Sequence, residues 1–307
     1  MKIQVTTSTF GKAGSKPLDY LRKFDITVET NPYGRKLTEE EAVEVLSGAE
    51  GSINGTEPLT ASVLNQLKKL KVISRCGTGM NNVDIEAAEK LGIKVFNTPT
   101  VHVDAVAELA LTGTLASLRN TARNDRAVRT GNWKKAMGKS LFGKQVGLIG
   151  YGKVAKRFAE LLKPFTEKVC YYDPFIEPDE NRPEGPVPCE LDQLIKESDV
   201  VSLHIPITEE NRNIIDGSVF ENCKPDVTII NTSRGGLIEE RDLYYFLKKH
   251  PEAGAYLDVF ETEPYDGELI ELENVTFSPH IATTTRQTRE KMELEAAINL
   301  MKGLGYE

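Results

Sequence analysis

The chain has 307 residues, a length that suggests two domains, and its 39% apolar and 27% charged residues are ordinary for a globular protein. A net charge of −8 argues against broad binding to nucleic acid or an anionic membrane, and no apolar run approaches the ~20 residues of a membrane-spanning helix. The first residues lack the apolar core of a signal peptide and the four cysteines form no C-x-x-C pair, so we expect a cytoplasmic protein with reduced thiols and no metal site.

Residues 1–98 alternate between apolar runs and segments with helical spacing. Thr38 and Glu41 form the pattern of a capping box, and Gly92 ends a later helix. Repeated βα units with short connections predict a parallel sheet with helices on both faces. The expected strands are 3–5, 26–29, 51–53, 71–74 and 93–96, and the expected helices are 18–24, 38–46, 58–67 and 84–90.

The loop RCGTGMNNVD, residues 75–84, follows the fourth expected strand at its carboxyl end, where open α/β sheets bind ligands. Gly77 and Gly79 allow backbone N–H groups to converge on an anion, although a plain turn with positive φ at both glycines has the same sequence. With Arg75 alongside and a cofactor domain following, we expect this loop to bind a substrate carboxylate. Its expected binding residues are Arg75, Gly77, Thr78 and Gly79.

The pattern changes near residue 98. Pro99 interrupts it, and residues 104–118 form a long expected helix rich in Ala and Leu. The polar segment 119–144 contains the single tryptophan, Trp133, and is too long for an ordinary connection. We therefore expect an arm or a lid there.

Residues 145–173 have the pattern of a dinucleotide-binding unit: strand, glycine turn, helix, strand and acid within about 30 residues. Gly150 permits the tight turn, and Gly152 lets the backbone approach a pyrophosphate at the helix N-terminus. Ala155 replaces the third glycine, a tolerated change, and Asp173 is placed to accept hydrogen bonds from the adenosine ribose. This acid predicts NAD rather than NADP, because its charge would repel a 2′-phosphate. A plain βαβ packing unit is the alternative.

The βα pattern then continues, with strands expected at 199–204, 226–231, 253–259 and 275–277 and helices at 191–196 and 243–249. Six strands are available to a Rossmann sheet, and a last helix, 284–301, is expected to return to the first domain. The predicted fold class is α/β with two doubly wound parallel-sheet domains. A Rossmann NAD-binding domain, residues 99–283, is inserted in a flavodoxin-like substrate domain, residues 1–98 plus 284–307.

Four polar residues follow the carboxyl ends of successive expected strands, where a bound nicotinamide would lie. They are Arg234, Asp258, Glu263 and His280. Oxidation of a 2-hydroxy acid needs a base, which histidine supplies, and a carboxylate on its other ring nitrogen would fix the tautomer. An arginine can hold the substrate carboxylate and polarise the carbonyl. Each residue alone has a simpler interpretation as a loop or surface group, but their common edge favours a catalytic site.

Seven segments carry a resemblance to a known family. They are RCGTGMNNVD, VAELALTGTLASLRN, FGKQVGLIGYGKVAKRFA, LHIPITEENRNII, NTSRGGLIEERDL, LDVFETEP and SPHIATTT. In this order they resemble the D-isomer-specific 2-hydroxyacid dehydrogenases along essentially the whole chain. The resemblance implies that Arg234, Glu263 and His280 are catalytic, as substrate anchor, histidine partner and acid/base. It also implies NAD contacts by Gly150, Tyr151, Gly152, Lys153, Val154, Asp173, His204, Pro206, Thr232 and Asp258, the last on the nicotinamide carboxamide.

The resemblance further implies a homodimer joined through the NAD-binding domains, with an arm like residues 119–145 embracing the partner. Trp133 would then lie at the interface, or simply pack within the chain. Two departures stand out. Ala282 replaces a glycine common in the family, and Asn54-Gly55-Thr56-Glu57 lacks the arginine with which several phosphoglycerate dehydrogenases meet the substrate phosphate.

We therefore expect an NAD-dependent D-2-hydroxyacid dehydrogenase acting on a small anionic substrate. Similarity to short-form D-3-phosphoglycerate dehydrogenases favours oxidation of 3-phosphoglycerate to 3-phosphohydroxypyruvate in serine biosynthesis. The alternative within the family is reduction of glyoxylate, hydroxypyruvate or a similar 2-keto acid. An alternative of another class is a protein that senses NAD(H) on the same fold without turnover.

Overall fold

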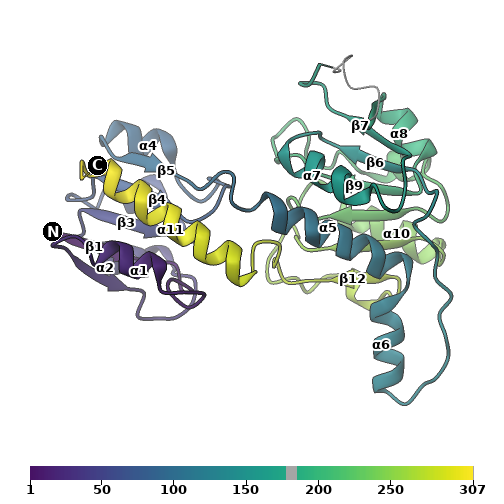
Figure 1. Ribbon diagram of the computed structural model, residues 1–307, viewed down its shortest axis with the longest axis horizontal. Coiled ribbons are helices and arrows are strands. Elements are labelled where there is room, and N and C mark those ends of the chain that lie inside the picture. Colours follow the sequence, from purple (N-terminus) through teal and green to yellow (C-terminus); the bar gives the residue numbers. More distant parts are fainter. Residues whose placement is uncertain (178–184, 307) are drawn as a thin grey trace. The chain divides into compact units, whose positions relative to one another are not determined.

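The structure, a computed structural model, describes residues 1–177 and 185–306 and divides into two compact units (Figure 1). The first unit is Met1–His102 with Thr283–Glu307, and the second is Val103–Ala282. The first boundary falls later than the expected residue 98, because the following residues stay bonded to the first unit. The Gly77 N–H donates to Thr98 Oγ1 (2.9 Å), and Thr78 Oγ1 lies 3.0 Å from His102 Nδ1.

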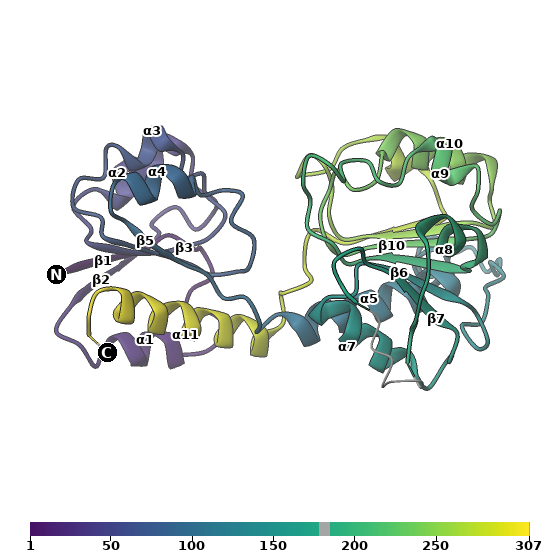
Figure 2. The ribbon, with the colours of Figure 1, turned by 90° about the horizontal axis from the view of Figure 1, so that it is seen from above.

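The first unit contains a parallel sheet of five strands with helices on both faces. The strands are β1 Lys2–Val5, β2 Thr27–Thr30, β3 Gly51–Asn54, β4 Val72–Arg75 and β5 Lys94–Phe96. The helices are α1 Lys16–Leu21, α2 Glu39–Leu46, α3 Ala61–Leu64, α4 Ile85–Lys90 and α11 Arg286–Gly303. The strand order is β2-β1-β3-β4-β5, with α1 and α11 on one face and α2, α3 and α4 on the other (Figure 2). This is the predicted flavodoxin-like sheet.

Local sequence explains where these helices begin. In the predicted capping box of α2, the Glu41 N–H donates to Thr38 Oγ1 (3.3 Å) and the Thr38 N–H to Glu41 Oε2 (3.0 Å). Asp84 caps α4 by accepting the Ala87 N–H (2.9 Å). α1 begins earlier than predicted, since Pro17 is favourable in a first helical turn.

The second unit contains a parallel sheet of seven strands. They are β6 Val146–Ile149, β7 Val169–Tyr172, β8 Val187–Pro188, β9 Val200–Leu203, β10 Thr228–Asn231, β11 Gly254–Leu257 and β12 Val275–Phe277. The helices are α5 Val103–Leu118, α6 Thr121–Arg129, α7 Lys153–Leu162, α8 Leu191–Glu197, α9 Gly217–Phe220, α10 Glu240–Lys249 and the 3-10 helix η1 Glu268–Glu271. The order β12-β11-β10-β9-β6-β7-β8 is that of a Rossmann sheet. All strands are parallel, and the order in which the chain adds them reverses between β6 and β9. The six expected strands are present, and the two-residue β8 is an addition.

Alternating side chains of these strands build a core on each face of the second sheet. Leu148 packs with α5 and α7, whereas the next residue, Ile149, packs with α8 and α10. On β11, Tyr256 likewise packs on the side of α5 and α7, and Leu257 packs on the side of α8 and α10. Figure 2 shows α5 and α7 on one side of this sheet and α8, α9 and α10 on the other. Burial on both faces explains the continuous apolar runs in the sequence.

The segment expected to be an arm or lid consists of α6 and an irregular return, and it projects from the second sheet (Figure 1). Asn124 Oδ1 accepts the Ala136 N–H (2.9 Å), and Lys139 Nζ donates to Glu252 O (2.8 Å), so the return is bonded both to α6 and to the loop before β11. No helix among the residues described is both long and apolar enough to cross a membrane.

Candidate active site

The predicted dinucleotide turn lies at the switch point of the second sheet. Gly150, directly after β6, has φ +89°, and a β-carbon there would lie 2.7 Å from the His204 carbonyl oxygen. Glycine is required on both counts. His204 follows β9, and its N–H donates to Ile149 O (2.7 Å), which joins the two strand ends. The turn is therefore at the point where open α/β sheets bind ligands.

Asp173, directly after β7, is oriented by backbone donors. Its Oδ2 accepts the Tyr151 N–H (2.8 Å) and its Oδ1 accepts the Phe175 N–H (3.0 Å). A carboxylate has about four acceptor positions, so both oxygens retain capacity for the hydroxyls of a ribose. The next residues, Pro-Phe-Ile-Glu at 174–177, contain no cation that could hold a 2′-phosphate.

The N-terminus of α7 has open space in front of it. Gly152 is the N-cap, and a β-carbon at this residue would meet nothing within 4 Å. Its φ is −73°, so no backbone strain requires glycine here, and close approach of a ligand phosphate is the remaining reason. Lys153 and Val154 form the first turn of the helix. Ala155, at the position of the third glycine, is fully buried and packs in the core.

Two buried polar atoms near this edge have no hydrogen-bond partner within residues 1–177 and 185–306. They are His204 Nδ1 and Thr232 Oγ1, both on residues expected to contact NAD. Such atoms are costly unless a ligand satisfies them, so they fit the cofactor. The other ring nitrogen of His204 lies 3.0 Å from Ser202 Oγ, and desolvation lowers the pKa of the ring to about 3. Pro206 follows on the same segment, where its carbonyl accepts from Asn211 Nδ2 (2.8 Å).

Arg234 lies in the loop after β10, and the side chain of Asn231 shapes that loop. Asn231 Oδ1 accepts the Ser233 N–H (3.0 Å), and its Nδ2 donates to Arg234 O (2.8 Å). Burial lowers the pKa of Arg234, while the Glu263 carboxylate acts in the opposite direction. Guanidinium remains charged at physiological pH, so a fixed cation lies near Glu263.

His280 and Glu263 form a hydrogen-bonded pair. His280 Nδ1 lies 2.9 Å from Glu263 Oε2 and 3.1 Å from Oε1. Because a carboxylate can only accept, we assign the hydrogen to Nδ1, which leaves Nε2 to exchange a proton. The Phe260 N–H donates to Glu263 Oε1 (3.2 Å) and orients the carboxylate. About half of the His280 side chain is exposed (49%), so the ring is accessible to a ligand.

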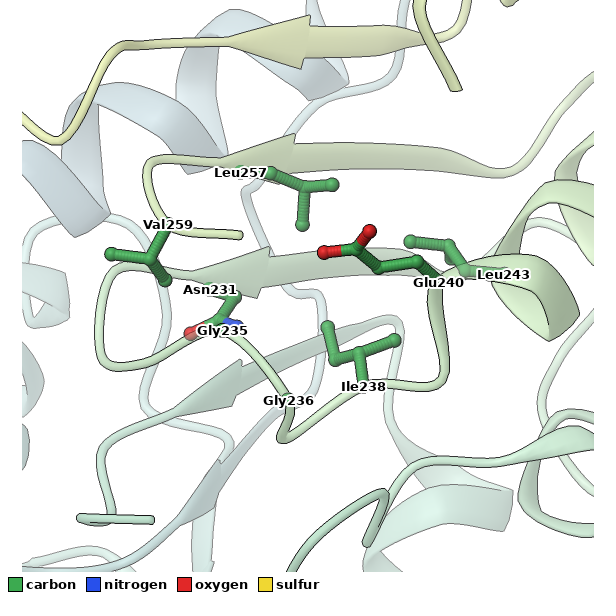
Figure 3. A pocket seen from close by; sticks show the side chains of 8 residues that line it. All are labelled: Asn231, Gly235, Gly236, Ile238, Glu240, Leu243, Leu257 and Val259. Atoms are coloured by element: carbon green, nitrogen blue, oxygen red, sulfur yellow. The ribbon is translucent and has the colours of Figure 1, made fainter. Parts of the chain in front are cut away.

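A small cavity lies beside these loops, lined from β10, β11 and the start of α10 (Figure 3). Glu240 lines it and accepts the Glu261 N–H (2.8 Å), which joins α10 to the loop of Glu263. On the other side, a β-carbon on Gly235 would lie 1.9 Å from Phe260 O. The loops of Arg234 and Glu263 are therefore in direct contact, and the three residues expected to be catalytic come together.

Asp258 contacts the loop that carries His280. It is 0% exposed, and its carboxylate accepts the Ser278 hydroxyl and the N–H groups of Ile281 (2.8 Å) and Ala282 (2.9 Å). The resemblance implied a contact with the nicotinamide carboxamide, which stays a prediction, and the bonds within the protein hold the loop of His280. Sequence reasoning missed Ser278, whose only signal is its place two residues before His280.

In the first unit, the expected carboxylate loop follows β4. A β-carbon on Gly77 (φ +142°) would lie 1.2 Å from Arg75 Nη1, so the guanidinium covers this glycine. The Gly77 N–H donates to Thr98 Oγ1, and Thr78 Oγ1 donates to Thr98 O (3.2 Å). The alternative interpretation, a turn with positive φ at both glycines, is wrong, because Gly79 does not have a positive φ. The Gly77 N–H is engaged within the protein, whereas sequence reasoning assigned it to an anion.

The loop after β3 holds a buried carboxylate. Glu57 is 1% exposed and accepts from Asn54 Nδ2 (2.9 Å), from the Gly55 N–H (3.1 Å) and from the Thr6 hydroxyl. The Gly55 N–H could otherwise bind an anion. A buried carboxylate therefore occupies the loop in which several phosphoglycerate dehydrogenases have an arginine.

These features define the class of protein. A Rossmann sheet with an open glycine turn and an acid after its second strand binds a dinucleotide. A paired histidine and an arginine lie at the same edge, and these are polar groups of the kind that a hydride-transfer site needs. Among the residues described, no three His, Cys, Asp or Glu side chains gather as a metal site.

Comparison with known proteins gives the family. Residues 111–282 match the model for the D-isomer specific 2-hydroxyacid dehydrogenase, NAD binding domain. The chain is 39% identical over 262 residues to hydroxypyruvate reductase from Thermotoga maritima, with 82% of this chain and 84% of that protein covered. It is 36% identical over 295 residues to D-3-phosphoglycerate dehydrogenase from Archaeoglobus fulgidus, with 94% and 55% covered. The crystal structure of the TT0316 protein from Thermus thermophilus superposes with a TM-score of 0.91 at 34% identity, covering 99% and 97%.

The chain belongs to the D-isomer-specific 2-hydroxyacid dehydrogenase family. It is an NAD-dependent oxidoreductase that acts on CH–OH groups. The predicted family, fold class and cofactor are confirmed, and a sensor without turnover is set aside.

Proposed function

We propose that this enzyme interconverts a small 2-keto acid of the glyoxylate or hydroxypyruvate kind and the matching D-2-hydroxy acid. The observation that carries this proposal is Glu57. A buried carboxylate that takes up the Gly55 N–H would repel a substrate phosphate at the end of β3. This reverses the order of the sequence prediction, which placed 3-phosphoglycerate first. The similarity to a hydroxypyruvate reductase supports the same choice.

The chemistry is assigned to three residues of the second unit. Bound NADH would supply the hydride in reduction, and bound NAD⁺ would receive it in oxidation. In reduction, His280 Nε2 gives its proton to the keto oxygen as that oxygen becomes a hydroxyl, and in oxidation it takes the proton back. Glu263 holds Nδ1 and stabilises the protonated ring, while Arg234 binds the carboxylate and polarises the carbonyl.

The remaining expected site residues keep their roles as part of this proposal. Asp173 would bind the ribose hydroxyls, and the turn with the first residues of α7 would hold the diphosphate. His204 and Thr232 would meet the cofactor with their unpaired polar atoms. The loop 75–79 of the first unit would bind the substrate carboxylate through Arg75 and the backbone beyond Gly77.

Oxidation of 3-phosphoglycerate is the second candidate. The chain matches a D-3-phosphoglycerate dehydrogenase over 94% of its length, although it spans about half of that protein. Burial raises the pKa of the Cys76 thiol to about 11, and the charges of Arg289 and Arg75 act in the opposite direction, so two cations lie near the end of β4. Glu293 also acts on this thiol and bonds to Arg289 (3.2 Å), which offsets part of the positive charge.

The two candidates separate in one assay. NADH oxidation is followed with glyoxylate, hydroxypyruvate and 3-phosphohydroxypyruvate, and we expect kcat/KM for the best unphosphorylated acid to exceed that for the phosphorylated one by about tenfold or more, equivalent to ~1.4 kcal/mol. A higher kcat/KM for 3-phosphohydroxypyruvate would overturn the proposal.

The matched variant is Glu57→Gln, which removes the charge and keeps the shape. It should raise kcat/KM for the phosphorylated acid by severalfold and leave the value for glyoxylate nearly unchanged, because glyoxylate has no second anion. An equal change for both substrates would show that Glu57 acts on folding rather than on charge selection.

We also propose that two copies pair through their NAD-binding units. The arm formed by α6 and its return carries Trp133, Met137 and Phe142, which are 79%, 87% and 69% exposed. Three large apolar side chains exposed on one projecting segment suit a surface that a partner covers.

A further inference from the structure

We propose that Asp258 is a positioning residue, which holds His280 in its working orientation through the backbone of the loop that carries it. This rests on the proposed role of His280 as the acid/base. It differs from the direct contact with the nicotinamide that the family resemblance implied for Asp258.

The first observation is the backbone of His280. Its φ is +54°, in the left-handed region that residues other than glycine rarely adopt and that costs of order 1 kcal/mol or more. The His280 N–H donates to the carbonyl oxygen of Asp258 (2.9 Å). Directly after the left-handed residue, the N–H groups of Ile281 and Ala282 both point to the Asp258 carboxylate. Successive N–H groups around a left-handed residue form a nest for an anion, and here the protein fills the nest with its own carboxylate.

The second observation is burial. Asp258 is 0% exposed, so in the folded protein these donors meet the carboxylate and not bulk water. Its third donor is the Ser278 hydroxyl, which has one hydrogen and gives it to Asp258. The Tyr256 hydroxyl, 2.7 Å from Ser278 Oγ, must then donate to Ser278. A buried chain of hydrogen bonds therefore runs from Tyr256 through Ser278 to Asp258, and burial also raises the pKa of Tyr256, which keeps its proton in place.

The third observation is that, apart from the loop backbone, few contacts hold the His280 ring in place. Within the part of the chain that the structure describes, its side-chain hydrogen bonds are to Glu263 alone, and Glu263 is itself 38% exposed. Glu263 can fix the rotation of the ring but not the position of its Cα. Asp258 supplies that second constraint, because it binds the backbone on both sides of His280. A displacement of about 1 Å in a catalytic group is enough to lower the rate by roughly 10²-fold.

The test is Asp258→Asn in the full-length enzyme, measured by kcat and by the dissociation constant of NADH. The asparagine NH₂ faces one of the two N–H groups of the nest, so that bond is lost while the volume stays the same. We expect kcat to fall by roughly 10- to 100-fold and NADH affinity to change by less than about threefold. A large loss of NADH affinity with an unchanged kcat would instead show a direct contact with the cofactor.

A double-mutant cycle with His280→Ala tests whether Asp258 acts through the histidine. His280→Ala alone should lower kcat by roughly 10²–10⁴-fold. If Asp258 only positions His280, the double variant should be about as active as His280→Ala alone, since effects of residues that act as a unit are not additive. Multiplied effects would overturn the positioning role. Wild-type turnover by His280→Ala would overturn the proposed function itself, which is a separate outcome.

Two further variants distinguish loss of positioning from simple misfolding. Ser278→Ala removes one donor and is expected to lower kcat by about three- to tenfold with NADH affinity kept. Wild-type kcat in this variant would contradict the proposal.

Asp199→Asn is the matched control. Asp199 is a largely buried carboxylate that accepts the backbone N–H of Gln145 (2.8 Å), and it lies at the end of β9 away from the candidate site. It should lower the melting temperature and leave kcat unchanged. A similar loss of kcat in Asp199→Asn would show that any weakened carboxylate has this effect.

Discussion

At the scale of single residues, the imidazole of His204 makes stability depend on pH. Desolvation lowers its pKa from 6.5 to about 3, so between these values the unfolded chain binds a proton that the folded protein does not. Stability therefore falls as pH falls from about 6.5 toward 3. By pH 5 the loss through this residue is about 2 kcal/mol for the protein without cofactor.

The check is calorimetry of the protein and of His204→Gln at pH 7 and pH 5. NADH should raise one melting transition, which identifies the second unit. That transition should move less with pH in the variant, since glutamine does not titrate. An equal shift in both proteins would show that other groups cause the pH dependence.

Some residues of the candidate site could be predicted from the sequence, and others could not. Arg234, Glu263 and His280 could be chosen because each follows an apolar strand, and parallel strands bring such positions to one edge. The bonds of Asp258 could not be foreseen, because they depend on the left-handed backbone at His280. Nor could the burial of Glu57, since the letters Asn-Gly-Thr-Glu do not show which donors the carboxylate meets.

At the scale of elements, the apolar strands and most helices were predicted, whereas β8, α9, η1 and α6 were not, α6 because its polar segment was interpreted as an arm or lid. β8 has two residues and α9 has four, which is too short for a period of 2.0 or 3.6 to be seen. Capping residues located helix starts well, because Thr38 and Asp84 make their contacts within three residues along the chain. Contacts between elements, such as that of Gly235 with Phe260, leave no such local pattern.

Two positions in the second unit are glycine for different reasons: one faces open space and the other lies against a neighbouring loop. Alanine at each position should therefore have a different effect. Gly152→Ala puts a methyl group into open space, so the melting temperature should change little while NADH binds roughly tenfold more weakly. Gly235→Ala forces a β-carbon against the Phe260 carbonyl, so the loops of Arg234 and Glu263 must separate. That variant should lose several degrees of melting temperature and most of its kcat.

Thermal unfolding and fluorescence titration with NADH measure both effects. If Gly152→Ala binds NADH as tightly as the parent, the space in front of α7 is not the diphosphate site. If Gly235→Ala keeps its melting temperature and kcat, the two loops do not depend on their close contact.

At the scale of the whole molecule, the exposed arm predicts a dimer. Trp133 and Met137 lie in the return after α6, and side chains of this size at 79% and 87% exposure are unusual unless a partner covers them. Sedimentation of the wild-type protein at low micromolar concentration should give twice the monomer mass. Changing both residues to serine should give the monomer, because it removes the largest apolar contacts of the arm. Phe175→Ser is the control: Phe175 is 94% exposed in the same unit but outside the arm, so this variant should remain dimeric. A wild-type monomer, or equal dissociation in the control, would contradict pairing through the arm.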